Sequence, residues 1–116
     1  MVYFVRAKSY FTYAKDLLSA LKKDASVDYE KFRLKAIDTF KTALKAIWAL
    51  TKPTAGKTPE LEVLFTEVLE TLSSEKKSKL KHLKSIVLDE GSKPDEVLTA
   101  LEEVIKLVEE ELKPIL

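Results

Sequence analysis

The sequence contains no cysteine, asparagine or glutamine, and its single histidine is His82. The lack of cysteine excludes disulfides, thiolate metal ligands and thiol nucleophiles, and one histidine argues against a histidine-based metal site. We therefore expect no metal and no cofactor. No apolar run approaches the roughly 20 residues that span a bilayer, and the first residues lack the apolar core of a secretion signal. These absences predict a cytoplasmic protein without a membrane partner.

Charge is abundant but balanced. The 20 Lys and Arg residues almost cancel the 19 Asp and Glu residues, which leaves a formal net charge of +1. This balance argues against a general nucleic-acid or membrane binder. Scarce methionine together with dominant Lys and Glu is typical of thermophile proteins, in which thermolabile residues are rare and ion pairs are many. A chain of 116 residues is expected to form one domain, residues 1–116, with its own core.

The longest helical pattern runs from Asp28 to Leu50, and we expect the other helices to pack against it. At about 100° per residue, its apolar side chains share one face: Tyr29, Phe32, Ala36, Phe40, Ala43, Leu44, Ile47 and Leu50. Arg33 interrupts this face, where a cation needs a partner or an open edge. Ser26 or Asp28 is expected to cap the helix through its side-chain oxygen.

A first helix is expected over Tyr3 to Lys23, where an apolar stripe recurs without glycine or proline. The long loop after the second helix is marked by Pro53 and Gly56. Thr58 is then expected to cap a third helix with Pro59 at its first position, where the missing N–H costs nothing.

The third helix is expected to break or kink at Ser73 and Ser74. The apolar face continues in phase beyond them, but Lys76 and Lys79 would then lie on it, and lysines are rarely buried in a core. A serine pair is also a good helix start.

Gly91 is expected to stop the next helix, and Ser92 with Asp95 three residues later imitates a capping box for a last helix ending near Lys113. No strand-like alternation is present. The sequence thus predicts an all-α protein, an antiparallel four-helix bundle, or five segments where the third helix is split.

The strongest local charge lies between Glu75 and Lys84. Five lysines in this tract are candidates for contacting nucleic acid: Lys76, Lys77, Lys79, Lys81 and Lys84. Such a patch contacts phosphates without reading bases, and its binding weakens steeply with salt. The alternative is a solvated helix face whose lysines complement the acidic last helix.

Five other residues are candidates for a ligand site or a subunit interface: Arg6, Tyr10, Tyr13, Arg33 and His82. Both arginines stand out in a chain that otherwise uses lysine, because a planar guanidinium suits a carboxylate, a phosphate or an aromatic face. A structural ion pair or a cation stacked on an aromatic ring is the alternative for each. The tyrosines share an edge of the first helix with Arg6, as in a dimer interface or in plain packing.

No motif indicates catalysis. Gly56, Lys57 and Thr58 end like a phosphate-binding loop, but the earlier glycine and the preceding strand of that motif are missing. The sequence around His82 does not suggest a catalytic triad, so no catalytic residue is predicted.

The segments SYFTYAKDLLSAL, DYEKFRLKAIDTFKTALKAIWAL and TPELEVLF, separated by a short gap and a Gly and Pro loop, resemble the HEPN family of higher eukaryote and prokaryote nucleotide-binding domains. Similar archaeal members are small stand-alone helical bundles. The resemblance implies a helical bundle, a dimer, and binding of nucleotide or RNA or a role in a toxin and antitoxin style system.

HEPN ribonucleases carry an arginine followed four to six residues later by a histidine, and this sequence lacks that pair. The resemblance therefore implies a non-catalytic binding protein. One alternative is a protein-interaction adapter whose basic and acidic helices dock onto another chain. The first two helices also resemble the microtubule-interacting and trafficking adapter domain. A second alternative is a degenerate ribonuclease using Tyr29, Arg33 and His82.

Overall fold

The computed structural model of the chain describes residues 2–24, 28–51 and 57–116, including every side chain there except those of Val2, Tyr3 and Asp24. Within these residues there is no strand, and the helices are α1 (Val2–Asp24), α2 (Tyr29–Thr51), α3 (Leu61–Leu69), α4 (Ser74–Leu88) and α5 (Pro94–Leu112), followed by a 3₁₀ turn, Lys113–Ile115. None of the described helices combines the length and the apolar character needed to cross a bilayer.

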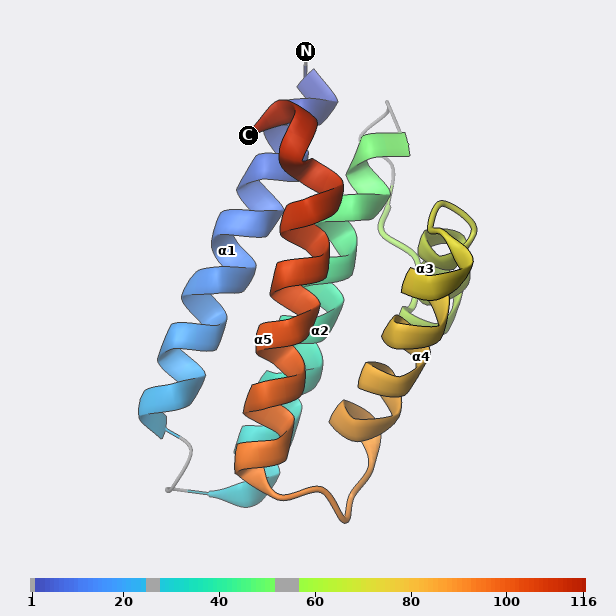
Figure 1. The fold of residues 1–116 in the computed structure, drawn as a ribbon. Coiled ribbons are helices and arrows are strands. Elements are labelled where there is room, and N and C mark those ends of the chain that lie inside the picture. Colours follow the sequence, from blue (N-terminus) through green and yellow to red (C-terminus); the bar gives the residue numbers. More distant parts are fainter. Residues whose placement is uncertain (1, 25–27, 52–56) are drawn as a thin grey trace.

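The helices surround α2. α1 and α2 run in opposite directions, and α5 packs against both of them (Figure 1). On the other side of this group, α4 lies against α2 and α5, and the short α3 packs on α2. α2 and α5 run in the same direction, whereas α4 runs opposite to both. The molecule measures 40 × 27 × 25 Å.

The core follows the central helix, as its sequence pattern predicts. From Thr39 to Ala49 nearly every residue of α2 is buried, including Thr39 and Thr42, because neighbouring helices cover the helix on several sides. Phe40 meets Phe65 of α3 with ring centroids 6.3 Å apart. The predicted core face fails at its start, where Tyr29 is 39% exposed.

Two helix starts follow the sequence prediction. Asp28 caps α2, with Oδ1 accepting hydrogen bonds from the backbone N–H groups of Glu30 at 3.0 Å and Lys31 at 3.4 Å. The alternative cap, Ser26, lies outside the described residues. Ser73 caps α4 by accepting from the backbone N–H of Lys76 at 3.3 Å. The break at the serine pair is therefore confirmed, and α3 and α4 are separate helices.

Two other starts differ from the prediction. α3 begins at Leu61, two residues after Pro59, and the residue before it, Glu60, makes no side-chain capping bond. Thr58 is therefore not its cap. The loop signals Pro53 and Gly56 lie outside the described residues.

The cap of α5 is shifted by one residue from the predicted Ser92 and Asp95 pair. Oε1 of Glu96 accepts a hydrogen bond from the backbone N–H of Lys93 at 2.9 Å. The hydroxyl of Ser92 instead donates to the carbonyl of Ile86 at 2.7 Å, so this side chain closes the end of α4.

Gly91 does not end α4 in the predicted way. The helix stops at Leu88, and Asp89 already has an extended backbone with φ −72° and ψ 122°. Gly91 has no positive φ. Its N–H donates to Oδ1 of Asp89 at 2.9 Å, which any residue with an N–H can do.

Candidate functional site: the lysines of α4

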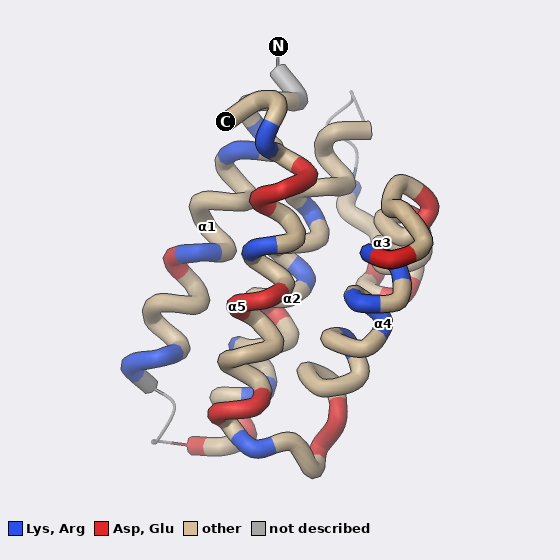
Figure 2. Tube along the Cα trace, in the orientation of Figure 1, with Lys and Arg blue, Asp and Glu red and all other residues tan. Residues whose placement is uncertain are grey.

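α4 carries the predicted lysine tract on two sides of its core-facing stripe. Leu80, Leu83 and Val87 form that stripe and are buried. Because the helix repeats every 3.6 residues, Lys76 continues this stripe one turn before Leu80, and Lys79 borders it on the side toward α5. The other three lysines, Lys77, Lys81 and Lys84, lie on the opposite side of the stripe. The charges of α4 and α5 are largely segregated by sign, with acidic segments along α5 and basic ones on α4 (Figure 2).

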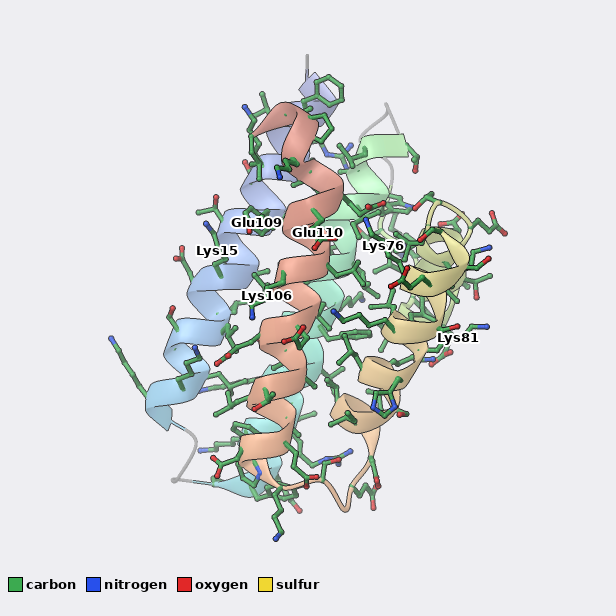
Figure 3. The ribbon with its side chains drawn as sticks, in the orientation of Figure 1. Lys15, Lys76, Lys81, Lys106, Glu109 and Glu110 are labelled. Atoms are coloured by element: carbon green, nitrogen blue, oxygen red, sulfur yellow. The ribbon has the colours of Figure 1, made fainter. Side chains whose placement is uncertain are left out.

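The lysines on the α5 side are neutralised. Nζ of Lys76 lies 2.6 Å from Glu111 and 3.5 Å from Glu110, and Lys79 lies 3.2 Å from Glu103. Figure 3 shows Lys76 on the side of α4 that faces α5. The alternative in which the tract complements the acidic last helix is confirmed for these two lysines.

We call the line of ion pairs between α4 and α5 the α4–α5 seam. Within it, ion pairing shifts the pKa values of Lys76 and Glu103 in the expected directions. The hydrogen bond from Lys76 to Glu111, with smaller contributions from the charges of Glu111 and Glu110, raises the pKa of Lys76 above its ordinary value. The hydrogen bond from Lys79, followed by the positive charge of Lys106, lowers the pKa of Glu103. Both shifts favour the charged forms, so the seam is ionic near neutral pH.

The other flank of α4 carries Lys77, Lys81 and Lys84, at spacings of four and three residues, and we call these three the basic stripe. Lys84 is held in place: its Nζ lies 2.8 Å from a carboxylate oxygen of Glu62 and 4.3 Å from the centroid of the Phe65 ring. Among the described residues, no carboxylate forms an ion pair with Lys77 or Lys81. Lys81 points away from α5 (Figure 3).

A surface hollow of about 390 Å³ lies beside the basic stripe, between α3 and α4. It is lined by Phe65, Lys81, Lys84, Ser85 and Leu88. The hydroxyl of Ser85 already donates to the carbonyl of His82 at 2.6 Å, and Lys84 is paired with Glu62, so Lys81 supplies the unpaired charge. The hollow offers an apolar floor with positive charge at its edge, which suits an anion that carries an apolar portion.

His82 is exposed on α4, and its side chain forms no hydrogen bond or ion pair with the described residues. Tyr29 and Arg33, the other two residues of the ribonuclease alternative, are bonded to backbone carbonyls. The Tyr29 hydroxyl donates to Ser92 at 2.6 Å or Glu90 at 3.0 Å. Nη2 of Arg33 donates to Leu88 at 3.1 Å. These contacts give Tyr29 and Arg33 structural roles.

The candidate residues of α1 do not converge on one pocket. The guanidinium of Arg6 lies 5.8 Å from the centroid of the Trp48 ring, and the ammonium of Lys45 lies 5.8 Å from that of Tyr10. Both contacts lie between α1 and α2, and they match the alternative in which these residues stack cations on aromatic rings and serve packing. Tyr13 is 53% exposed on the outer side of α1.

The α3–α4 hollow could not be foreseen from the sequence. Phe65 reads as an ordinary core position, and only the folded chain brings it under Lys84.

In the part of the chain that the structure describes, no group of three or more His, Cys, Asp or Glu side chains is placed to hold a metal ion.

No protein-family model, no curated protein and no solved structure matches this chain.

Proposed function

We propose that this chain is a non-catalytic, HEPN-like binding protein that contacts the phosphate groups of RNA through Lys77 and Lys81 of the basic stripe. The observation that carries the proposal is the difference between the two flanks of α4. Acidic residues of α5 neutralise Lys76 and Lys79, whereas Lys77 and Lys81 have no carboxylate partner among the described residues. Unpaired lysines spaced along one helix flank suit a phosphate backbone.

The neighbouring hollow supports RNA over a purely ionic ligand. Its apolar floor of Phe65 and Leu88 lies beside Lys81 and Lys84, so a phosphate and an adjoining nucleoside find charge and apolar surface together. Phe65 itself is only 7% exposed, so it supplies a floor and does not stack fully on a base.

The proposal also includes the four-helix bundle that the sequence predicts. We propose that α1, α2, α4 and α5 form this antiparallel bundle and that α3 is an added segment over α2. The alternating directions of these four helices along the chain support this description (Figure 1).

The test is fluorescence anisotropy with a short single-stranded RNA over a range of salt concentrations. The variant Lys77→Ala/Lys81→Ala removes two charges from the basic stripe. The control, Lys31→Ala/Lys113→Ala, removes two exposed lysines elsewhere that form no ion pair with described residues. Wild type and control are expected to bind alike, and the slope of log K against log salt is expected to fall by about 1.4 in the stripe variant.

Absence of binding at low salt would overturn the proposal, and so would equal losses in the two variants. The first result would favour the protein-interaction adapter. The RNA is expected to stay intact throughout, because Tyr29 and Arg33 are engaged by backbone carbonyls.

A further inference from the structure

The outer face of α1 is not covered by the rest of the molecule. α1 packs against α2 and α5 with its opposite side, and it lies at the edge of the molecule away from α4 (Figure 1). A shallow depression of about 430 Å³ lies on this face. It is lined by Val5, Lys8, Ser9, Thr12, Tyr13 and Asp16, and we call these residues the α1 face.

The α1 face is partly apolar at exposed positions. Val5 is 62% exposed and Tyr13 is 53% exposed. Ser9 and Thr12 lie between them and are short enough for a second helix to approach closely. Aromatic residues such as Tyr13 are enriched at protein interfaces.

The α1 face carries one positive and one negative side chain at equal distances from Thr12. Lys8 and Asp16 are each four residues from Thr12, about 6 Å along the helix axis in opposite directions. Neither side chain forms an ion pair with a described residue, so this face offers a cation and an anion at equal distances from Thr12.

We propose that the α1 face binds a second copy of this chain, with the two α1 helices antiparallel and a two-fold axis beside Thr12. In this arrangement, a residue that lies a given number of positions before Thr12 faces the residue of the partner helix that lies the same number of positions after Thr12. Lys8 then meets Asp16 of the partner subunit, and the reciprocal pair forms at the other end. Tyr13, one residue from the axis, lies next to Tyr13 of the partner subunit.

The charge pattern selects this arrangement. Parallel α1 helices would place lysine against lysine and aspartate against aspartate, which is unfavourable. An antiparallel pair closes on itself, so association stops at the dimer. The interface lies away from α4 and leaves the basic stripe accessible, so the inference is independent of the proposed RNA binding.

The dimer is expected to be weak. α1 is about 34 Å long, and contact between two such helices lies at the small end of the range around 800 Å² per partner that stable complexes bury. We therefore expect dissociation in the micromolar range or weaker, and association must be measured up to high protein concentration.

The test is a charge exchange followed by sedimentation equilibrium. Lys8→Glu and Asp16→Lys should each weaken the homodimer at least about tenfold, because each brings like charges together at two symmetric contacts. An equimolar mixture of the two variants should form a heterodimer of wild-type affinity. In that heterodimer the introduced glutamate meets the introduced lysine at one contact, and the original lysine and aspartate meet at the other. The double variant Lys8→Glu/Asp16→Lys should regain homodimerisation.

Matched controls are Lys31→Glu and Asp38→Lys, which make the same charge changes at exposed positions of α2. They are expected to dimerise like wild type, and fluorescence of the buried Trp48 checks that every variant is folded. A wild-type protein that stays monomeric at the highest concentration would overturn the inference. Single variants that dimerise like wild type, or a mixture that stays monomeric, would overturn it as well. RNA binding is measured separately on the same samples, so failure of the two proposals is distinguishable.

Discussion

Nη2 of Arg33, in the first turns of α2, donates a hydrogen bond of 3.1 Å to the carbonyl of Leu88, the last residue of α4. The cation that interrupts the apolar face of α2 thus binds the negative end of another helix, which lowers the energy of both groups. Tyr29, one turn earlier, contacts the carbonyls of Glu90 and Ser92 in the turn that follows. Together, Tyr29 and Arg33 hold the α4–α5 turn against the start of α2.

The Arg33 contact has an offsetting cost, because its Nε is buried without a hydrogen-bond partner among the described residues. A hydrogen bond from a charged donor contributes about 1.5–3 kcal/mol, and an unsatisfied buried donor costs about 1–3 kcal/mol. Arg33→Met removes both groups and is expected to change the free energy of unfolding by less than about 1 kcal/mol. Tyr29→Phe removes only favourable bonds and is expected to cost about 1 kcal/mol.

Urea unfolding measures both variants under the same conditions. A loss above about 3 kcal/mol for Arg33→Met would show that the Leu88 bond outweighs the unpaired Nε. A neutral Tyr29→Phe would show that the hydroxyl exchanges its carbonyl partners for water without loss.

Gly91 is expected to accept alanine. Its φ is not positive, and a Cβ added there would meet Oδ1 of Asp89 at 3.5 Å, an ordinary van der Waals distance. The unfolded chain has less freedom with alanine, so Gly91→Ala should stabilise the fold by about 0.4–1 kcal/mol. The measurement is the midpoint of thermal unfolding, and a lower midpoint would mean that the turn requires glycine.

Local features of this fold could be predicted, and features that depend on distant residues could not. Asp28 and Ser73 cap their helices through the backbone N–H groups two or three residues ahead, so the sequence contains the whole interaction. The partner of Arg33 is 55 residues away, and only the packing of α4 on α2 reveals it.

The candidate site shows the same limit. Opposite charge on the tract and on the last helix predicted ion pairs, but not which lysines form them. That choice depends on the rotation of α4, which turns Lys76 and Lys79 toward α5 and Lys81 away from it (Figure 3). The predicted cap at Ser92 is wrong because α5 begins one residue later, with Lys93 at its N-cap, and the Ser92 hydroxyl donates to the carbonyl of Ile86.

Trp48 provides a spectroscopic test of how α3 is attached to α2. Its Nε1 donates to Oε2 of Glu67 at 3.0 Å, and the indole is 5% exposed. Glu67→Leu leaves that donor without this acceptor and should cost about 1–2 kcal/mol, with a shift in tryptophan emission. Glu67→Gln keeps an acceptor oxygen and should retain most of the stability. Identical losses for the two variants would mean that the carboxylate acts through its charge.

The ion pairs of Glu103 are expected to stop stabilising the α4–α5 seam at low pH. Its folded-state pKa is lowered below the ordinary value of 4.5, chiefly by the hydrogen bond from Lys79. A group with a lowered folded pKa stabilises the fold above its unfolded pKa, and this contribution disappears as the pH falls through the folded value. The difference in stability between wild type and Glu103→Gln should therefore be present at neutral pH and vanish in acid. Lys79→Met should reduce it at neutral pH, and a difference that persists in acid would contradict the ion-pair explanation.

The ion pairs of Lys76 are expected to stop stabilising the seam at high pH. Its folded-state pKa is raised above the ordinary 10.5, first by the hydrogen bond to Glu111. The stabilisation is therefore complete below pH 10.5 and is lost as the pH rises through the folded value. Because the pair is partly exposed, Lys76→Met should cost no more than about 1 kcal/mol at neutral pH. Other lysines also deprotonate in alkali, so the informative quantity is the difference between wild type and variant. That difference should shrink to zero at high pH, and a difference independent of pH would mean that Lys76 stabilises α4 through its aliphatic stem and not through its charge.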